Sequence, residues 1–349
     1  MPRTVVCPTL TRLTVPRLTA THLTAPRLTL PVPVRHREQV PHVSASTTAP
    51  PGGRRRRPPL LLLLPAALVL IPLVAYPIYQ LGLLSVLDFG QAQASGGVPT
   101  SFVGFGNYAT ILADEQFWTV LLQTVGFAAF CVVATLAVGA TLAVLLTKVG
   151  RWPRLLLTTA AVAAWAAPAM TGSTVWSFLF DTNLGLVNHT LERIGLSGFH
   201  EFNWFYDKWT AFLIVGAVVV WHSFPFVMVT LYAGIRAIPE EVMEAAALDG
   251  AGTWTTFRRI TAPMLRPILT IVVIQSVIWD FKVFTQIYVM TEGGGIAGQN
   301  LVLNVYAYQK AFASSQYGLG AAIGVIMLLI LVVPTVLYIR GLRRTGNEL

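Results

Sequence analysis

The chain has 349 residues, of which 54% are hydrophobic and only 11% are charged. Soluble domains carry about 25% charged residues, so this composition indicates a membrane protein. The net charge of +9 comes from one end, because residues 1–59 hold ten Arg and one Glu, whereas the rest holds 14 basic and 14 acidic residues. A nucleic-acid partner for the body of the chain is therefore not predicted.

The N-terminal residues 1–59 are low in complexity, and the triplet RLT recurs at Arg12, Arg17 and Arg27. Interspersed prolines and the absence of apolar periodicity predict a disordered, basic Pro/Thr/Arg-rich cytoplasmic tail. Its last arginines, at 54–57, can attract anionic membrane lipid. They can equally act only as a topology signal beside the first span, which the positive-inside rule favours.

Six apolar runs follow, each long enough for the ~17–25 residues that cross a bilayer. They cover residues 60–87, 118–146, 155–179, 209–235, 267–290 and 317–339. If both termini are inside, the inner segments hold 20 Lys and Arg and the outer loops hold three. Because positive charge marks the cytoplasmic side, the sequence predicts an all-α membrane protein with six transmembrane helices and both termini cytoplasmic.

The longest polar segment between two of these runs covers residues 239–267, on the predicted cytoplasmic side. Pro239 suits the first position of a helix, where its missing N–H is not needed. Glu240 and Glu244 are four residues apart, so they project from one face and place negative charge at the helix start. A short helix is therefore predicted to begin this segment.

A second short helix is predicted after a glycine elbow. Gly250 can adopt the left-handed conformation that ends the first helix. Thr253 can then cap the second helix, and Pro263 ends it. Apolar residues recur along one side of it, every three positions, at Trp254, Phe257 and Ile260.

The residues of this segment resemble the EAA loop of the membrane permeases of ABC importers. That motif reads E-A-A, two residues, D-G-A, and about nine residues later I-x-x-P. The matching residues are Glu244, Ala245, Ala246, Leu248, Asp249, Gly250, Ala251, Ile260 and Pro263. The resemblance implies an ABC importer type I permease fold for residues 60–349, with a loop that docks into a separate ATPase and passes on its motion. The alternative is an interfacial helix pair that only connects two spans.

The resemblance also implies a role for individual ATPase-coupling residues. Gly250 would permit close backbone approach and the tight turn. Glu244 and Asp249 would contact the ATPase or cap backbone amides. Ala245 and Ala246 would keep the helix slim enough to dock.

Outer segments at residues 102–108, 183–188, 291–295 and 306–312 resemble the sugar-permease branch of these importers. This broader resemblance covers residues 60–344. It implies uptake of a mono-, di- or oligosaccharide, or a glycerol-phosphate relative, delivered by an extracellular or periplasmic binding protein. One residue departs from the branch, which usually reads T-x-G-G-P, because Gly295 stands in the proline position. Since glycine frees the backbone where proline would fix it, the geometry of this outer loop is left open.

Polar residues interrupt the fifth apolar run at Trp279, Asp280 and Lys282. Ionisable residues within a span are costly and are functional candidates by default. We expect Asp280 to accept sugar hydroxyls and Trp279 to offer a ring face, pointing away from Lys282 unless the helix breaks there. The alternative is that both charges lie in the outer half and reach water or each other. Trp176 is a further pathway candidate, although aromatic residues at span ends are more often belt residues.

The sequence contains no G-x-x-x-x-G-K-[ST] phosphate loop, no visible Ser/His/Asp arrangement and no metal-ligand spacing. We therefore expect no catalytic residues, no metal and no cofactor on this chain, with ATP and Mg²⁺ held by the partner ATPase. The resemblance implies a complex in the bacterial cytoplasmic membrane, working by alternating access. It would contain a second homologous permease, two ATPase subunits, an extracellular binding protein and contacts to membrane lipid.

Two other functions stay open at this point. An ABC importer for another small polar solute, such as a polyamine or an amino acid, would share the same loop. An ion-coupled secondary transporter should show midspan carboxylates in both halves of the chain. Only Asp280 qualifies in this sequence.

Overall fold

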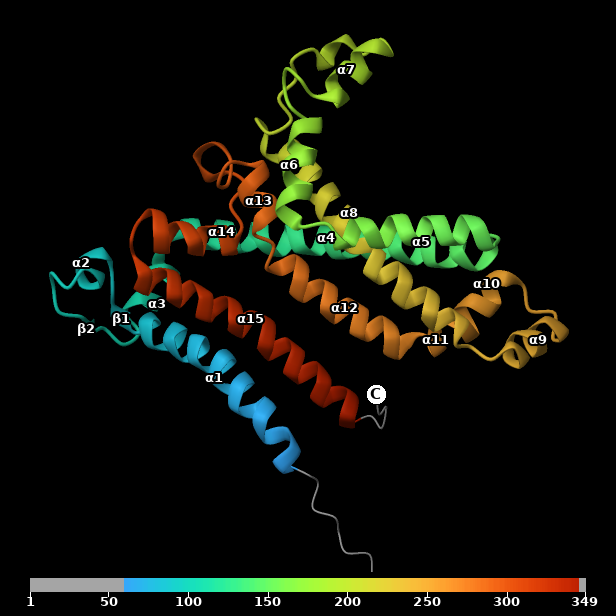
Figure 1. Ribbon diagram of the computed structural model, residues 1–349, viewed down its shortest axis with the longest axis horizontal. Coiled ribbons are helices and arrows are strands. Elements are labelled where there is room, and N and C mark those ends of the chain that lie inside the picture. The colour runs from blue at the N-terminus through green and yellow to red at the C-terminus, as the bar shows by residue number, and fades with distance from the viewer. Residues whose placement is uncertain (1–59, 345–349) are drawn as a thin grey trace, which may run out of the picture. The chain divides into compact units, whose positions relative to one another are not determined.

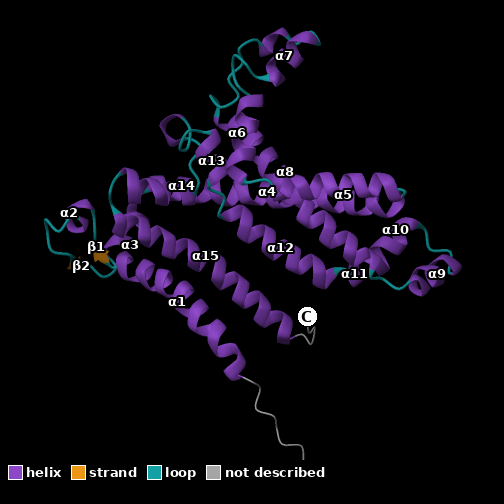
Figure 2. Cartoon of the chain, viewed as in Figure 1, coloured by secondary structure: helices purple, strands orange, loops and turns teal. Residues whose placement is uncertain are grey.

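The computed structural model describes residues 60–344, so the prediction for the basic tail, residues 1–59, lies outside the described residues. The described part is almost wholly helical (Figures 1 and 2). Within it the strands are β1 (Leu87–Asp88) and β2 (Ser101–Phe102), an antiparallel pair that encloses α2 (Gln91–Ala94). The helix α3 (Gly106–Ala113) follows this pair. The sequence prediction of an all-α protein is confirmed.

The long helices of the fold are α1 (Leu60–Ser85), α4 (Glu115–Lys148), α8 (Lys208–Arg236) and α15 (Tyr317–Arg344). Carboxylate caps begin two of them. Asp114 accepts from Gln116 N at 2.9 Å at the start of α4, and Asp207 accepts from the amides of Trp209 and Thr210 at the start of α8. Each cap satisfies amides that have no partner inside the helix, so each fixes where its span begins.

The helices α4 and α8 form the central pair of the molecule, and small residues let them approach closely. A Cβ atom added to Gly139 of α4 would lie 2.6 Å from Val227 Cγ1 on α8. A Cβ atom added to Gly216 of α8 would lie 2.8 Å from the Phe130 ring on α4. Small residues at helix interfaces are typical of packing inside membranes.

Four helical stretches of the described residues are long and apolar enough to cross a membrane, namely Leu63–Ser85, Glu115–Lys148, Lys208–Arg236 and Arg266–Met290. The number is up to five if a bent helix pair, α5 (Arg151–Ala166) and α6 (Ala169–Leu179), is taken as one span. The sixth apolar stretch expected from the sequence is the shorter Tyr317–Val333, at the start of α15.

The span predicted over residues 155–179 is a bent helix pair, because α5 and α6 meet at an angle of 102°. Pro168 follows Ala167 at this bend, and the residue before a proline is pushed out of the helical region. His222 of α8 donates from Nε2 to the Ala167 carbonyl at 3.1 Å. This hydrogen bond satisfies a carbonyl that the bend leaves without a helical partner.

A second interruption separates α12 (Arg266–Phe281) from α13 (Thr285–Met290). A loop then leads through the short 3-10 turn Ile296–Gly298 to α14 (Leu303–Tyr308), the π-helical turn Gln309–Ala313 and α15. Gly295, which stands where the sugar-permease motif that this loop resembles has proline, has φ +75°. Proline is locked near φ −65°, so this loop has a conformation that proline cannot adopt.

A folded segment joins α6 to α8 and contains α7 (Leu186–Arg193) and the 3-10 turn Ser197–Phe199. Figure 1 shows α7 at the end of a projection from the helical body. The buried side chain of Asn188 holds it together, since its oxygen accepts from Trp204 Nε1 at 2.7 Å and its nitrogen donates to the carbonyls of Thr182 and Phe202. The projection is therefore a small folded unit with its own polar centre.

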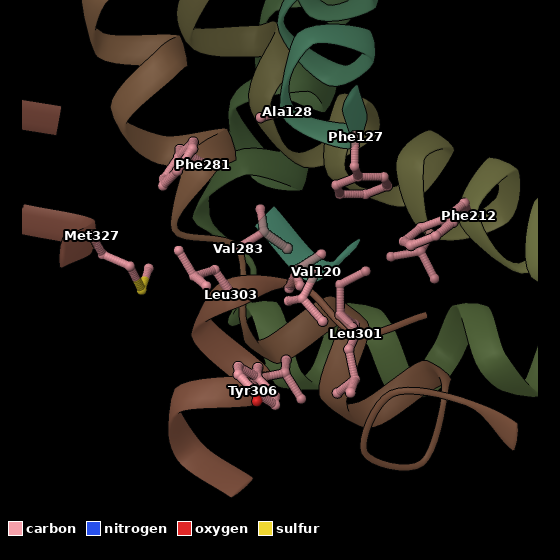
Figure 3. Packing of buried hydrophobic residues seen from close by; sticks show 14 of the residues in the cluster. Val120, Phe127, Ala128, Phe212, Phe281, Val283, Leu301, Leu303, Tyr306 and Met327 are labelled. Carbon is pink, nitrogen blue, oxygen red and sulfur yellow. The ribbon is translucent and has the colours of Figure 1, made fainter. Parts of the chain in front are cut away.

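The main core joins α4, α8, the segment of residues 281–306 and α15 (Figure 3). The rings of Phe127 and Phe212 meet at 5.3 Å between α4 and α8. Leu301 and Leu303 fill the space beside them, and Met327 reaches in from α15. A buried hydrogen bond from Leu303 N to Thr124 Oγ1 at 2.8 Å ties the returning segment to α4.

Candidate coupling segment and pathway residues

The polar segment after α8 begins with α9 (Glu240–Leu248). Pro239 is the residue before the helix rather than its first residue, and Glu240 and Glu241 occupy the first turn. At the other end, Gly250 has φ +71°. Gly250 N donates to Ala247 O at 3.1 Å, and Ala251 N donates to Ala246 O at 3.0 Å. The predicted helix and its left-handed glycine elbow are confirmed.

The second helix differs in detail from its prediction. It begins as α10 (Thr253–Thr256), whose N-terminal cap is Gly252, so the prediction that Thr253 caps it is wrong. The chain then runs through the π-helical turn Phe257–Thr261 into α11 (Ala262–Met264). Pro263 lies at the start of α11 and does not end the helix, because a proline in the first turn needs no N–H partner.

The two helices expose apolar side chains on an otherwise polar segment. Leu248 is 89% exposed and Trp254 is 71% exposed, and the Trp254 ring stacks on Phe257 with a centroid distance of 5.7 Å. The carboxylates of Glu244 and Asp249 are exposed and form no ion pair with the residues that the structure describes. Exposed apolar groups beside free carboxylates are typical of a surface that binds another protein.

Of the two matched alanines, Ala245 is exposed and Ala246 is buried. The buried alanine also supplies the carbonyl that accepts from Ala251 N across the elbow. The structure therefore brings six of the seven sequence-predicted coupling residues together, on α9 and its elbow. The seventh, Pro263, lies further along the chain, at the start of α11.

Asp280 lies on the last turn of α12 and is 2% exposed. Its Oδ2 has no hydrogen-bond partner among the described residues. The helix α12 packs against α4 in the fold. A carboxylate without partners in an apolar region is energetically costly, so it marks a place where a polar group has a function.

A buried serine accompanies Asp280 and was not predicted from the sequence. Ser276 is four residues earlier on α12 and is 4% exposed. Residues four apart share a helix face, so its hydroxyl and the carboxylate lie on the same side of α12. The spacing from Asp280 was the signal that could have identified it.

Lys282 lies outside the helix that carries Asp280. It is the C-terminal cap residue of α12, its side chain is exposed, and its carbonyl accepts from Asn304 Nδ2 at 2.9 Å. Because α12 ends between the two, Asp280 is buried while Lys282 is exposed. Among the described residues the two form no ion pair with each other.

The two predicted tryptophans pack on α8 and are not paired with each other. The Trp279 ring meets Phe226 at 5.1 Å. The Trp176 ring stacks on Phe180 at 6.0 Å and meets the edge of Trp221 at 5.8 Å. The four predicted pathway residues therefore do not form a single contact cluster, since Trp176 lies on α6, Trp279 and Asp280 lie on α12, and Lys282 follows it.

A polar network near the start of α4 was also missed by the sequence analysis. The buried Tyr306 donates its hydroxyl to Asp114 Oδ2 at 2.7 Å, and Lys310 Nζ lies 3.6 Å from the same oxygen. The hydrogen bond from Tyr306 lowers the pKa of Asp114 below its usual value, and burial raises the pKa of Tyr306. The spacing of Tyr306 and Lys310 was visible in the sequence, but their distant partner was not.

The sequence of this chain is similar to those of known membrane transport proteins. The model of the family described as "binding-protein-dependent transport system inner membrane component" matches residues 135–344. The chain is 41% identical over 286 residues to the diacetylchitobiose uptake system permease protein DasB of Streptomyces coelicolor, covering 82% of this chain and 87% of that protein.

Two further similarities cover comparable lengths. The sulfoquinovosyl glycerol transport system permease protein SmoG of Agrobacterium fabrum is 31% identical, covering 80% of this chain and 88% of that protein. A chain in the crystal structure of a bacterial ABC transporter involved in the import of the acidic polysaccharide alginate matches with a TM-score of 0.69. At 19% identity, covering 82% of this chain and 94% of that chain, it shows a shared fold.

Proposed function

Because the chain belongs to the binding-protein-dependent transport system inner membrane component family, we propose that it is the permease subunit of an ABC importer for a sugar. It is a multi-pass membrane protein with several apolar helices. The named relatives at 41% and 31% identity are permeases for diacetylchitobiose and sulfoquinovosyl glycerol. The proposed solute class is accordingly a disaccharide, an oligosaccharide or a glycosyl-glycerol.

The proposed topology has six spans and both termini in the cytoplasm. The spans are α1, α4, the bent pair α5–α6, α8, α12 with α13, and α15. The excess of Lys and Arg on one side supports this orientation. It makes residues 1–59 a cytoplasmic tail, residues 60–349 the permease domain, and α9 with its elbow a cytoplasmic feature.

The observation that carries the proposal is the geometry of α9 and the elbow at Gly250. The motif residues Glu244, Ala245, Asp249 and Gly250 are all exposed there. A helix with an acidic face and an exposed apolar end, bounded by a left-handed glycine turn, suits insertion into a cleft of another subunit. In the proposed mechanism, ATP-driven closure of two ATPase subunits moves α9, and the spans alternate between inward- and outward-facing arrangements. ATP and Mg²⁺ are bound by those subunits.

The proposed solute pathway passes the end of α12. Asp280 accepts hydrogen bonds from sugar hydroxyls, and Trp279 and Trp176 offer ring faces to the apolar side of a sugar. Lys282, at the interruption of α12, lines the same route. The unpaired Oδ2 of Asp280 supports this role, because a bound hydroxyl would satisfy it.

Affinity purification of the tagged chain in mild detergent tests the assembly. The expected complex contains a second permease, two copies of an ATPase and, when solute is present, a binding protein that stimulates ATP hydrolysis in proteoliposomes. Diacetylchitobiose is the first solute to try, with a polyamine and an amino acid as comparisons. A chain that purifies alone and transports alone in liposomes would refute the proposal.

A further inference from the structure

A groove runs along the outside of the central helix pair, near the start of α8. Its volume is about 460 Å³. Its walls are apolar, formed by Leu122, Phe127 and Phe130 of α4 and by Phe212 and Leu213 of α8. Leu122 is 72% exposed and Leu213 is 57% exposed, so the groove is open along its length.

One end of the groove is polar and positively charged. Lys208 is the first residue of α8, and Gln123 of α4 lies opposite it. The hydrogen-bond network orients the Gln123 amide so that its oxygen accepts from Lys208 Nζ at 2.9 Å and its nitrogen donates to Leu301 O at 2.9 Å. The ammonium group also lies 5.3 Å from the centroid of the Trp209 ring.

The charge of Lys208 is not balanced within the described residues. No ion pair with a carboxylate involves it, and its side-chain partners are a neutral amide and an aromatic ring. A cation held by neutral groups at the end of an apolar groove is complementary to a molecule with an anionic head and an apolar chain. A sugar does not suit the walls, because its hydroxyls would lose their hydrogen bonds to water there.

We propose that this groove binds an anionic phospholipid, with one acyl chain lying along the outside of α4 and α8 and the phosphate at Lys208. The position along the helix supports this occupant. Lys208 and Trp209 begin an apolar span, and Trp209 is 73% exposed. An exposed tryptophan at the end of a span is typical of the level of lipid headgroups. The groove extends from there toward the middle of the span, as an acyl chain does. The proposal is independent of which sugar is transported.

Gly126 gives a direct way to fill the groove. It lines the apolar part, and a Cβ atom added to it would meet nothing within 4 Å. A leucine at this position therefore occupies the space of the acyl chain without a clash at Cβ. Since leucine is also a better helix former than glycine, α4 should not be weakened.

The test uses the purified complex of this chain with its partner subunits, incubated with dioleoyl phosphatidylglycerol or dioleoyl phosphatidylcholine. Native mass spectrometry measures the lipid retained per complex. A Lys208→Gln variant should retain about fivefold less phosphatidylglycerol, because one lysine near anionic lipid contributes on the order of 1 kcal/mol. Its retention of phosphatidylcholine should change much less. The matched control is Arg193→Gln, which removes a cation from α7, away from the groove.

The Gly126→Leu variant should reduce retention of both lipids while the partner subunits still co-purify in normal amounts. Equal phosphatidylglycerol retention in the parent, Lys208→Gln and Gly126→Leu proteins would overturn the proposal. Loss of the second permease from the Gly126→Leu complex would overturn it as well, since the groove would then be a protein interface. If Arg193→Gln lowers retention as much as Lys208→Gln does, the proposal is also overturned, because general charge attraction then explains the binding.

Discussion

The elbow at Gly250 gives the sharpest test of how this chain is coupled to its ATPase. Its φ of +71° lies in the left-handed region, where a residue with a Cβ costs about 1–2 kcal/mol more than glycine. No atom lies within 4 Å of a Cβ built at this position, so a Gly250→Ala change adds backbone strain and no steric clash. A difference of 1–2 kcal/mol is a factor of about 5–30 in the population of the elbow.

We therefore expect Gly250→Ala to lower the affinity of the chain for its ATPase subunit by about 5–30-fold, because only the population with the left-handed elbow binds. Gly250→Asn should have a smaller effect, because asparagine enters the left-handed region more readily. The assay is the amount of ATPase subunit retained by the tagged chain at limiting concentration, together with ATP hydrolysis by the complex. The amount of the chain in the membrane is measured alongside, to exclude a folding defect.

The matched control is Gly252→Ala, two residues further along the same segment. Gly252 has φ −65°, and a Cβ there also meets nothing within 4 Å. This change should leave ATPase binding unaffected. Equal losses in Gly250→Ala and Gly252→Ala, or no loss in Gly250→Ala, would refute the argument that the left-handed elbow positions the docking helix.

Three further changes have defined outcomes. Asp280→Asn should raise the KM for sugar uptake about tenfold or more, because a hydrogen bond to a charged group contributes about 1.5–3 kcal/mol; unchanged uptake would exclude Asp280 from the pathway. Tyr306→Phe should lower the free energy of thermal unfolding by about 1 kcal/mol at neutral pH, since it removes the hydrogen bond to Asp114. That hydrogen bond lowers the pKa of Asp114, so its contribution to stability is present above the unfolded pKa of about 3.9. The contribution is lost as the pH falls through the pKa of the folded state. The stabilities of the parent and the variant should therefore converge in acid. Gly139→Ala should lower the free energy of unfolding by about 1–3 kcal/mol, because the added Cβ would lie 2.6 Å from Val227 Cγ1. An unchanged melting temperature in detergent would contradict this expectation.

The coupling segment was largely predictable because its structure is set by local chemistry. Acidic residues at a helix start and a glycine at a helix end act on their own neighbours, so Glu240 and Gly250 could be interpreted without tertiary information. Two details failed: the cap is Gly252 and not Thr253, and the helix passes through a π-helical turn before Pro263 that the local pattern does not specify. Which subunit the segment contacts is not encoded in those local rules at all.

The pathway residues were predictable as polar exceptions in an apolar run, but their arrangement was not. Asp280 could be found because a carboxylate in a span is rare. That its oxygen lacks a partner, while Lys282 points outward, depends on where α12 ends and on how α4 packs against it. The network of Tyr306 with Asp114 joins residues 192 positions apart, a distance over which no sequence pattern operates.

The bend after α5 has a consequence for how this part of the chain can cross a bilayer. The 16 residues of α5 rise only about 24 Å at 1.5 Å per residue, whereas the hydrocarbon layer is about 30 Å thick. Where the chain turns by 102°, the bond from His222 shows that the protein itself solvates the freed carbonyl. The α5 helix alone is therefore shorter than the hydrocarbon layer, so the residues after the bend are needed for any complete crossing. A carbonyl that leaves a helix inside lipid has only the protein to bond to, and His222 supplies that partner here.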